Sequence, residues 1–542
     1  MNRPRSLLTH VFSANGAFHI SLGQRPRNST AARASAEIAF QGRADESRFQ
    51  RWHVGIRGSW GGAPGWYVAA PLALKRCVLA LGLVAVLLPA AGRTAEKGRP
   101  FAPVADAVKA RTGREVRWQE DAEARAENLR AVRALLRKPL NAGTAAQIAL
   151  LNNPGLQATF EDIGISAADL REAGVWKNPT LDLSFRFPDR PPSGVNAEEA
   201  VIFNLLDLFM VPLRKRVAAE HLQAAQLRVA DEALQLVAEV KSAVWRLQGD
   251  EQLIGRLRLV RDAGGAALEL AQKQHAAGNI ADLALMQQQA SYSQARLDVA
   301  MAEGEMRGHR EKLTRLLGVW GVDTGWKIGG ELPSLPASDP ALAGLESLAV
   351  AQRLDLAAAR AELGGVVRAL GLTKAYRFVG ALEFGIDTER DTDRTNVTGP
   401  RMSVELPIFN QGQARVAKAQ AELRRAERKF EALAIGIRSE VRELHDQLVS
   451  KREIARFYHD DLLPGRIAIL NQSLLFYNGM LLGNYELFAA KTEELHAERG
   501  SIEALRDYRI ARAELERTVG GSFSARPVAA PPAPAKASAH QH

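Results

Sequence analysis

The residue types that could support catalysis or metal binding are spread along the chain without a pattern that supports chemistry. No nucleophile elbow, phosphate-binding glycine loop or His-Glu-x-x-His pair occurs. Asp460 and Asp461 form a short acidic pair, which is more often a solvated surface than a site. The 11 histidines are scattered. Six of them are interpreted as exposed helix positions: His221, His275, His309, His445, His459 and His496.

The sequence therefore predicts no enzyme, no cofactor and no metal site, and the elements of structure must carry the function. Of the 542 residues only Cys77 is a cysteine, which excludes a disulfide framework and a cysteine-based zinc site. The net charge of +10 resides in residues 1–100, which hold 14 Lys and Arg against 4 Asp and Glu. The remaining residues hold 57 of each sign. No nucleic-acid partner is predicted.

The first 95 residues are interpreted as a leader and a signal peptide. Lys75 and Arg76 precede an apolar run from Cys77 to Ala91, which is too short for a membrane-spanning helix. Cleavage is expected near Ala91–Ala95. Cys77 precedes the apolar run instead of following it, so no lipid anchor is expected. The alternative is a buried helix or an uncleaved N-terminal anchor.

An internal repeat with an offset of about 200 residues divides most of the chain into two halves. The aligned positions are Leu156 with Leu356, Trp176 with Tyr376, Leu208-Phe209 with Ile408-Phe409, Gly278 with Gly479, and Leu317-Gly318 with Val519-Gly520. The expected organisation is an N-terminal periplasmic segment (96–140), a first repeat (141–318), a linker (319–343), a second repeat (344–520) and an Ala/Pro-rich disordered tail (521–542).

Each half is expected to hold a helix, two strands and a long helical hairpin. The first helices are predicted over 144–174 and 344–374. Strands with alternating apolar residues are predicted at 181–187, loosely at 198–206, at 378–387 and at 401–406. Apolar residues spaced three and four apart then predict long helices, one continuous from Arg214 to Gln274 and one kinked at Pro464. The returning helices are predicted over 283–317 and 487–518.

Four short amphipathic strands cannot form a membrane barrel by themselves, because about eight strands are the minimum. Three copies of the chain would supply twelve strands, and the long helices would pack beneath them as a tube. Trp176 and Tyr376 precede strands, where they would fit an interfacial aromatic girdle or an ordinary core. The predicted fold class is mainly α with a small β part, in which tandem-duplicated long helical hairpins form a tunnel below a trimeric 12-stranded transmembrane barrel, to which each chain contributes four strands.

From about residue 140 to 520 the chain resembles the TolC-type outer-membrane efflux channels. The resemblance rests on the tandem duplication and on three segments: Asn153-Pro154-Gly155-Leu156, Asn178-Pro179-Thr180-Leu181 and Leu406-Pro407-Ile408-Phe409-Asn410-Gln411-Gly412. The third segment matches the family's strand-to-helix turn, carried by Pro407, Phe409, Asn410 and Gly412. In the first half the corresponding residues, Asp207 to Pro212, lack the proline and glycine positions of this turn.

The resemblance implies a homotrimer in outer-membrane lipid, with a periplasmic adaptor protein and an inner-membrane efflux pump as partners. It also implies that the helical tips meet the adaptor, and that carboxylates just past the tips form a periplasmic gate. The tip residues are Gly278, Asn279, Tyr477, Asn478, Gly479 and Gly483, and the gate residues are Asp282 and Glu486. Glycine would turn the chain at both tips. Solvated helix carboxylates are the alternative for the gate.

The predicted function is a passive outer-membrane exit duct of a tripartite efflux or secretion system, with a periplasmic helical tunnel and a cleaved export signal. Heavy metals, drugs, other small molecules and secreted proteins all remain open as cargo. The alternative is a periplasmic coiled-coil adaptor or structural spacer without a pore. The 200-residue duplication and the strands favour the channel.

Overall fold

The computed structural model describes residues 100–190, 194–339, 341 and 343–523, and all of them belong to one compact unit, Ala95–His542. The predicted leader and signal peptide lie outside the described residues, as do Pro191 and Pro192 of the first strand loop and the tail after residue 523. Among the described residues, no helix combines the length and the apolar character needed to cross a membrane.

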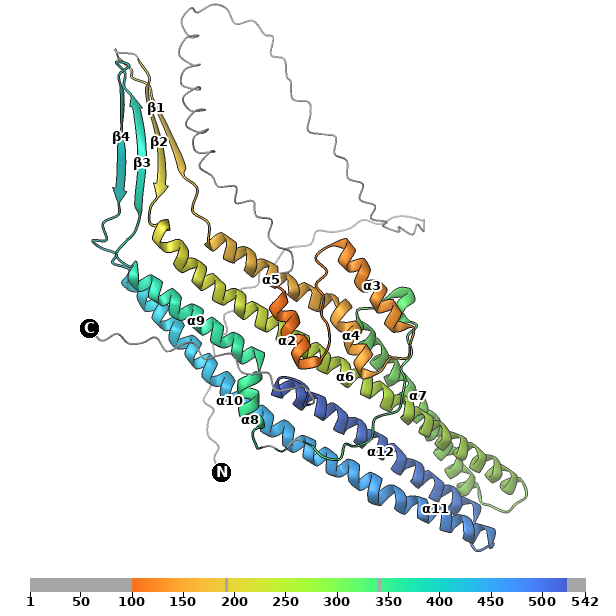
Figure 1. The fold of residues 1–542 in the computed structure, drawn as a ribbon. Coiled ribbons are helices and arrows are strands. Elements are labelled where there is room, and N and C mark those ends of the chain that lie inside the picture. Colours follow the sequence, from red (N-terminus) through yellow and green to blue (C-terminus); the bar gives the residue numbers. More distant parts are fainter. Residues whose placement is uncertain (1–99, 191–193, 340, 342, 524–542) are drawn as a thin grey trace, which may run out of the picture. The chain divides into compact units, whose positions relative to one another are not determined.

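The two halves have the same order of elements (Figure 1). The first contains α4 (Ala142–Asn152), α5 (Pro154–Ala173), β1 (Thr180–Arg186), β2 (Asn196–Asn204), α6 (Asp207–Ala276) and α7 (Asp282–Leu317). The second contains α8 (Leu345–Gln352), α9 (Leu354–Ala375), β3 (Leu382–Arg390), β4 (Asn396–Val404), α10 (Gln413–Phe457), the π-helical turn η2 (Tyr458–Leu462), α11 (Leu463–Asn478) and α12 (Asn484–Val519).

Three further elements lie outside this repeat. Helices α2 (Ala102–Thr112) and α3 (Ala122–Leu136) precede it, and the 3-10 turn η1 (Gly321–Thr324) lies between the halves. Valines of α2 and α3 pack with α4, α5 and α6 in the larger of the two main apolar cores. The other main core joins α8, α10 and α12. The N-terminal segment is therefore a folded part of the first half, although the sequence analysis assigned it no elements.

Each half contains the same joint between a returning helix and the helix pair that opens the half. Helices α4 and α5 are separated at Asn153, and α8 and α9 at Arg353, where the backbone is extended. Helix α7 ends against the first break at Gly318 (φ +67°), and α12 ends against the second at Gly520 (φ +97°). The single helices predicted over 144–174 and 344–374 are therefore each split in two, the first at an N-cap asparagine followed by proline.

The hairpin helices lie side by side in the order α7, α6, α12 and α10, and α11 continues α10 along α12. With 70 residues, α6 is about 105 Å long. The second hairpin departs from regular α-helix at η2, directly before Pro464. There the ring of Tyr458 lies so close to Gly500 that a β-carbon on Gly500 would overlap it. The deviation predicted at Pro464 is thus a π-helical turn that begins six residues earlier.

The four strands form one antiparallel sheet in the order β1-β2-β3-β4. The register joins the two halves, because Val201 of β2 lies opposite Ile386 of β3. Strands β3 and β4 extend into the predicted loop, since the chain reverses within Asp391–Thr395. Arg394 takes a left-handed conformation in this turn. Residues 378–381, predicted as strand, lie outside β3.

Candidate functional site

The tip of the first hairpin is a glycine turn closed by a contact between a histidine and an aspartate. Gly278 has φ +73°, and its amide donates to the carbonyl of His275 at 2.9 Å. The next amide, of Asn279, donates to the carbonyl of Gln274 at 2.8 Å. His275 Nε2 lies 2.6 Å from Asp282 Oδ1, so the end of α6 is linked to the start of α7. A β-carbon on Gly278 would meet nothing within 4 Å.

The tip of the second hairpin reverses at Met480 and not at Gly479. Met480 has φ +58° and donates to the carbonyl of Tyr477 at 3.0 Å, whereas Gly479 has an ordinary φ of −81°. Met480 is therefore the structural counterpart of Gly278, and the alignment of Gly278 with Gly479 is off by one residue. A methionine in this conformation is strained by roughly 1 kcal/mol. Its side chain is 94 % exposed.

The two predicted gate carboxylates have different surroundings. Asp282 is held by His275, as described above, and its side chain is 80 % exposed. Glu486 accepts a hydrogen bond from the amide of Gly483 at 2.8 Å and so caps the start of α12. The tips are joined by a bond from the Tyr485 hydroxyl to Gln274 Oε1, at 2.6 Å. The structure thus gives Glu486 a local structural role, which the sequence analysis missed.

The predicted strand-to-helix turn of the second half lies between β4 and α10. Pro407 follows the strand, and Phe409 is 94 % exposed. Asn410 Oδ1 accepts from the amide of Gly412, which has φ +73° and lies against Arg377. In the first half, Asp207 replaces this arrangement: it accepts from the amide of Lys177 and pairs with Arg214, both at 3.0 Å.

One face of the sheet is apolar over the half nearer the helices, where it presents Leu181, Val201, Phe203, Phe384, Ile386, Met402 and Val404. Toward the turns, Leu183 and Phe185 share this face with Glu199, Thr388, Arg390, Asn396 and Thr398. The other face is mostly polar, with Asp182, Ser184, Arg186, Glu198, Asn204, Glu383, Asp387, Glu389, Arg401 and Ser403, and it also carries Ala200, Ile202 and Val397. The apolar side chains are not covered: Leu181, Phe185 and Ile386 are 56–59 % exposed. Trp176, just before β1, is 61 % exposed.

Charged side chains gather where α6 of the first half meets α9, α10 and α12 of the second, and Lys241 of α6 pairs there with Glu516 of α12. Arg353 bonds to both Asp355 and Glu440 at 2.6–3.0 Å. Burial lowers the pKa of Arg353, but these bonds more than offset it and raise the pKa. Nearby on α6, burial and the neighbouring Asp355 raise the pKa of Asp231 to about 6.

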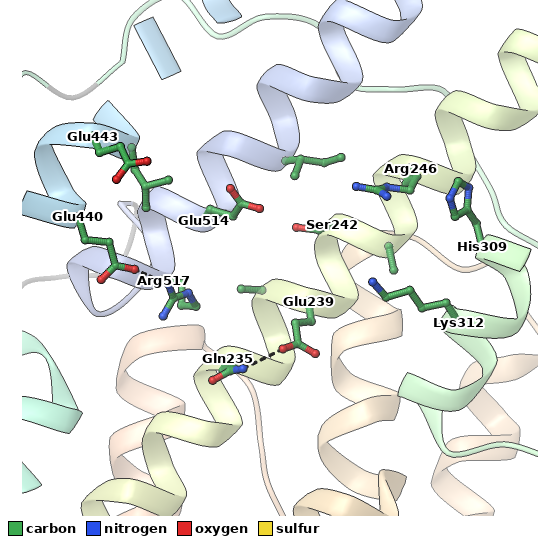
Figure 2. Close-up of a pocket in the computed structure, with 14 residues that line it drawn as sticks. Gln235, Glu239, Ser242, Arg246, His309, Lys312, Glu440, Glu443, Glu514 and Arg517 are labelled. Carbon is green, nitrogen blue, oxygen red and sulfur yellow. Dashed lines mark hydrogen bonds and ion pairs between the residues drawn. The ribbon is translucent and has the colours of Figure 1, made fainter. Parts of the chain in front are cut away.

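Further along α6, a charged groove of about 560 Å³ lies among α6, α7, α10 and α12 (Figure 2). The sequence analysis did not single it out, although Gln235, Glu239, Ser242 and Arg246 follow the spacing of one helix face. His309, interpreted from sequence as exposed, is instead half-buried beside this groove and bonds to Asp250 at 2.6 Å. Within the described ranges, no three His, Cys, Asp or Glu side chains are grouped to hold a metal ion.

No family model matches the chain, and no curated protein matches it by sequence. By structure it is similar to a membrane protein from Pseudomonas aeruginosa, with a TM-score of 0.60, 20% identity, and coverage of 76% of this chain and 94% of that one. The outer membrane protein VceC from Vibrio cholerae matches with a TM-score of 0.57 and 15% identity, over 72% of this chain and 97% of that one. The Neisseria gonorrhoeae MtrE outer membrane channel, in its open state, matches with a TM-score of 0.56 and 17% identity, over 71% of this chain and 89% of that one.

The described chain is therefore a duplicated helical-hairpin protein with a small open sheet. Its fold is that of the TolC-type outer-membrane channels, as the sequence resemblance indicated. The similarity covers nearly the whole of each solved chain, so both hairpins and the sheet take part in it.

Proposed function

We propose that this chain is the outer-membrane channel of a tripartite efflux system and acts as a passive exit duct. In this proposal three copies assemble in outer-membrane lipid, and their hairpins form a periplasmic tunnel. Substrate arrives from an inner-membrane pump through a periplasmic adaptor. The predicted signal peptide, in residues 1–95, would export the chain.

The open sheet carries this proposal. Strands β1 and β4 each pair with a single described strand, so both edges of the sheet are free to pair. A free edge beside an exposed apolar face favours aggregation in water, and in lipid each unpaired backbone group costs several kcal/mol. Pairing β4 of one copy with β1 of the next removes both problems. Three copies give twelve strands, with the apolar face turned to lipid and the polar face lining a pore.

The hairpin tips are proposed to dock the adaptor through Gly278, Asn279, Tyr477, Asn478, Gly479 and Gly483. The observation in favour is the exposure of the second tip, where Met480 and Leu481 are 94% and 75% exposed. Apolar side chains at this exposure fit burial against a partner protein.

The direct test is the mass of the detergent-extracted full chain and its single-channel conductance in a planar bilayer. We expect a trimer that conducts. A stable monomer, or a trimer without conductance, would favour the pore-less spacer.

The sheet faces give a matched pair of substitutions on β4. Met402→Arg puts a charge on the apolar face and is expected to destabilise the inserted trimer by about 2 kcal/mol, within the range for lipid-facing barrel positions. Ser403→Arg puts the same group on the polar face, beside Glu383, and is expected to be mild. The measurement is the trimer fraction in isolated outer membranes. Equal losses from both variants would contradict the assignment of the faces.

For the gate, Asp282→Asn is expected to reduce the cation preference of the channel, because it removes three exposed carboxylates from the tip end of the trimer. Glu486→Gln is expected to change it less, since Glu486 is occupied in capping α12. Reversal potentials across a salt gradient at low ionic strength measure this preference. If Asp282→Asn left the preference unchanged, Asp282 would have no role in the gate.

A further inference from the structure

The groove among α6, α7, α10 and α12 has two poles of opposite charge. Figure 2 shows Arg246 and Lys312 on one side, and Glu443 and Glu514 on the other. Ser242 lies between the poles, and buried apolar side chains of α6 and α12 complete the lining. The groove thus offers cations, a hydroxyl and anions in succession.

The polar groups beside these poles are already satisfied. Glu440 bonds to Arg353 and Arg517, and His309 bonds to Asp250. Glu239 accepts a hydrogen bond from Gln235 at 2.9 Å. These groups form the fixed frame of the groove and have limited capacity for another partner.

The pole residues themselves form no ion pair with any described residue, and Arg246, Lys312 and Glu443 are exposed to solvent. Among the described residues, Arg246, Lys312 and Glu514 form no hydrogen bond or ion pair, and Glu443 has only the amide of Gln447. Elsewhere α6 and α12 are joined across the same seam by ion pairs, Lys241 with Glu516 at 3.2 Å and Arg256 with Glu498 at 3.0 Å. At the groove, Arg246 of α6 and Glu514 of α12 form no such pair.

From this arrangement we propose that the groove binds amphoteric small molecules, which carry a cationic group and a carboxylate on one apolar frame. The carboxylate pairs with Arg246 and Lys312, and the cationic group pairs with Glu443 and Glu514. A molecule with charge of one sign alone would be repelled by one pole, whereas an amphoteric molecule satisfies both. Charge-assisted hydrogen bonds at both ends hold it in one orientation.

The position of the groove gives this site a role in transport, and this step rests on the proposed function. On α6 the groove residues Gln235, Glu239, Ser242 and Arg246 lie on nearly the opposite face from Val240, Val244 and Leu247, which pack in the core with α2–α4. For the tunnel to be open along its axis, the bulky α2–α4 segment must lie outside the tube. The groove then lies on the inner wall, where it binds amphoteric substrate in passage.

The test measures binding of norfloxacin, a fluorescent zwitterion, to the full-length protein in detergent by fluorescence anisotropy. Its methyl ester retains only the cationic group, and its N-acetyl derivative retains only the carboxylate. We expect norfloxacin to bind at least about tenfold more tightly than either derivative, because each loses one charged contact.

Variants of each pole separate the two contacts. The double variant Arg246→Gln/Lys312→Gln is expected to weaken norfloxacin by roughly tenfold and to leave the ester unchanged. Glu514→Gln is expected to weaken norfloxacin and to leave the N-acetyl derivative unchanged. Lys429→Gln and Glu427→Gln, at exposed positions of α10 outside the groove, remove the same charges and are expected to change nothing.

The outcomes distinguish this site from the channel function. No saturable binding at millimolar norfloxacin, or equal effects from the pole and control variants, would overturn the site even if the trimer conducts. Binding that depends on both poles in a protein that does not conduct would support the site and overturn both the channel and the role in transport.

Discussion

Replacing Asp339 by alanine is expected to release the linker from the second hairpin at a cost of about 3 kcal/mol. Asp339 bonds to Arg452 at 2.8 Å, to the Tyr508 hydroxyl at 2.6 Å and to Arg512 at 3.2 Å. The side chains of Asp339 and Arg452 are only 9% and 11% exposed, so removing the carboxylate leaves a nearly buried cation without its counterion. Burial and Asp339 together raise the pKa of Tyr508.

Limited proteolysis of the linker with a protease of broad specificity gives the measurement, because cleavage reports local opening. A cost of about 3 kcal/mol corresponds to cleavage more than about 100-fold faster around residues 333–339. Asp446→Ala is the control, since Asp446 lies on α10 with a side chain that is 78% exposed. An Asp339→Ala linker that was cleaved at the wild-type rate would show that the carbonyl contacts of Arg452 and Arg509 are sufficient to hold it.

The elements with strong periodicity were predicted well from sequence. The returning helices predicted over 283–317 and 487–518 are α7 and α12, with ends displaced by at most three residues. The poorly alternating strand near 198–206 is β2, which is flanked by strands on both sides. Ile202 on the opposite face interrupts its alternation, and the apolar face with Val201 and Phe203 becomes clear only against the cross-strand partners. Alternation within a single strand is therefore a weaker indication of an apolar face than the aligned positions of all four strands.

Most features that prediction missed depend on contacts between distant segments. Nothing local distinguishes Met480 from Gly479 as the turn residue, because glycine is the usual choice for a left-handed conformation. The helix break at Asn153 has a local signal that the prediction passed over, because Asn153 caps α5 and Pro154 begins it. The break at Arg353 has no such local signal, and α12 ends beside it at Gly520. Likewise the groove requires charges from four helices, and His309 is drawn inward by Asp250 from a different helix. A repeat predicts the order of elements but not these pairings.

Gly318→Ala is expected to open the joint between α7 and the α4–α5 break, at a cost of about 3 kcal/mol. Gly318 has φ +67°, which costs an L-residue roughly 1 kcal/mol. The new β-carbon would also lie 2.5 Å from the carbonyl oxygen of Asn152, and backbone cannot rotate away as a side chain does. Overpacking of this kind costs about 1–3 kcal/mol more. The hydrogen bonds that the side-chain amide of Asn152 donates to the carbonyls of Leu317 and Gly318 would be lost first.

The tip glycine supplies the matched control, because Gly278 has nearly the same φ of +73° but open space around it. Gly278→Ala therefore carries the backbone strain without the overlap, and is expected to cost about 1 kcal/mol. Hydrogen exchange at each site separates the cost of backbone strain from the cost of steric overlap. Amides near residues 150–156 are expected to exchange about 100-fold faster in Gly318→Ala. Those at the tip are expected to change less than about tenfold in Gly278→Ala. Similar changes at both sites would mean that strain alone sets the cost, and that the joint adapts to the added methyl group.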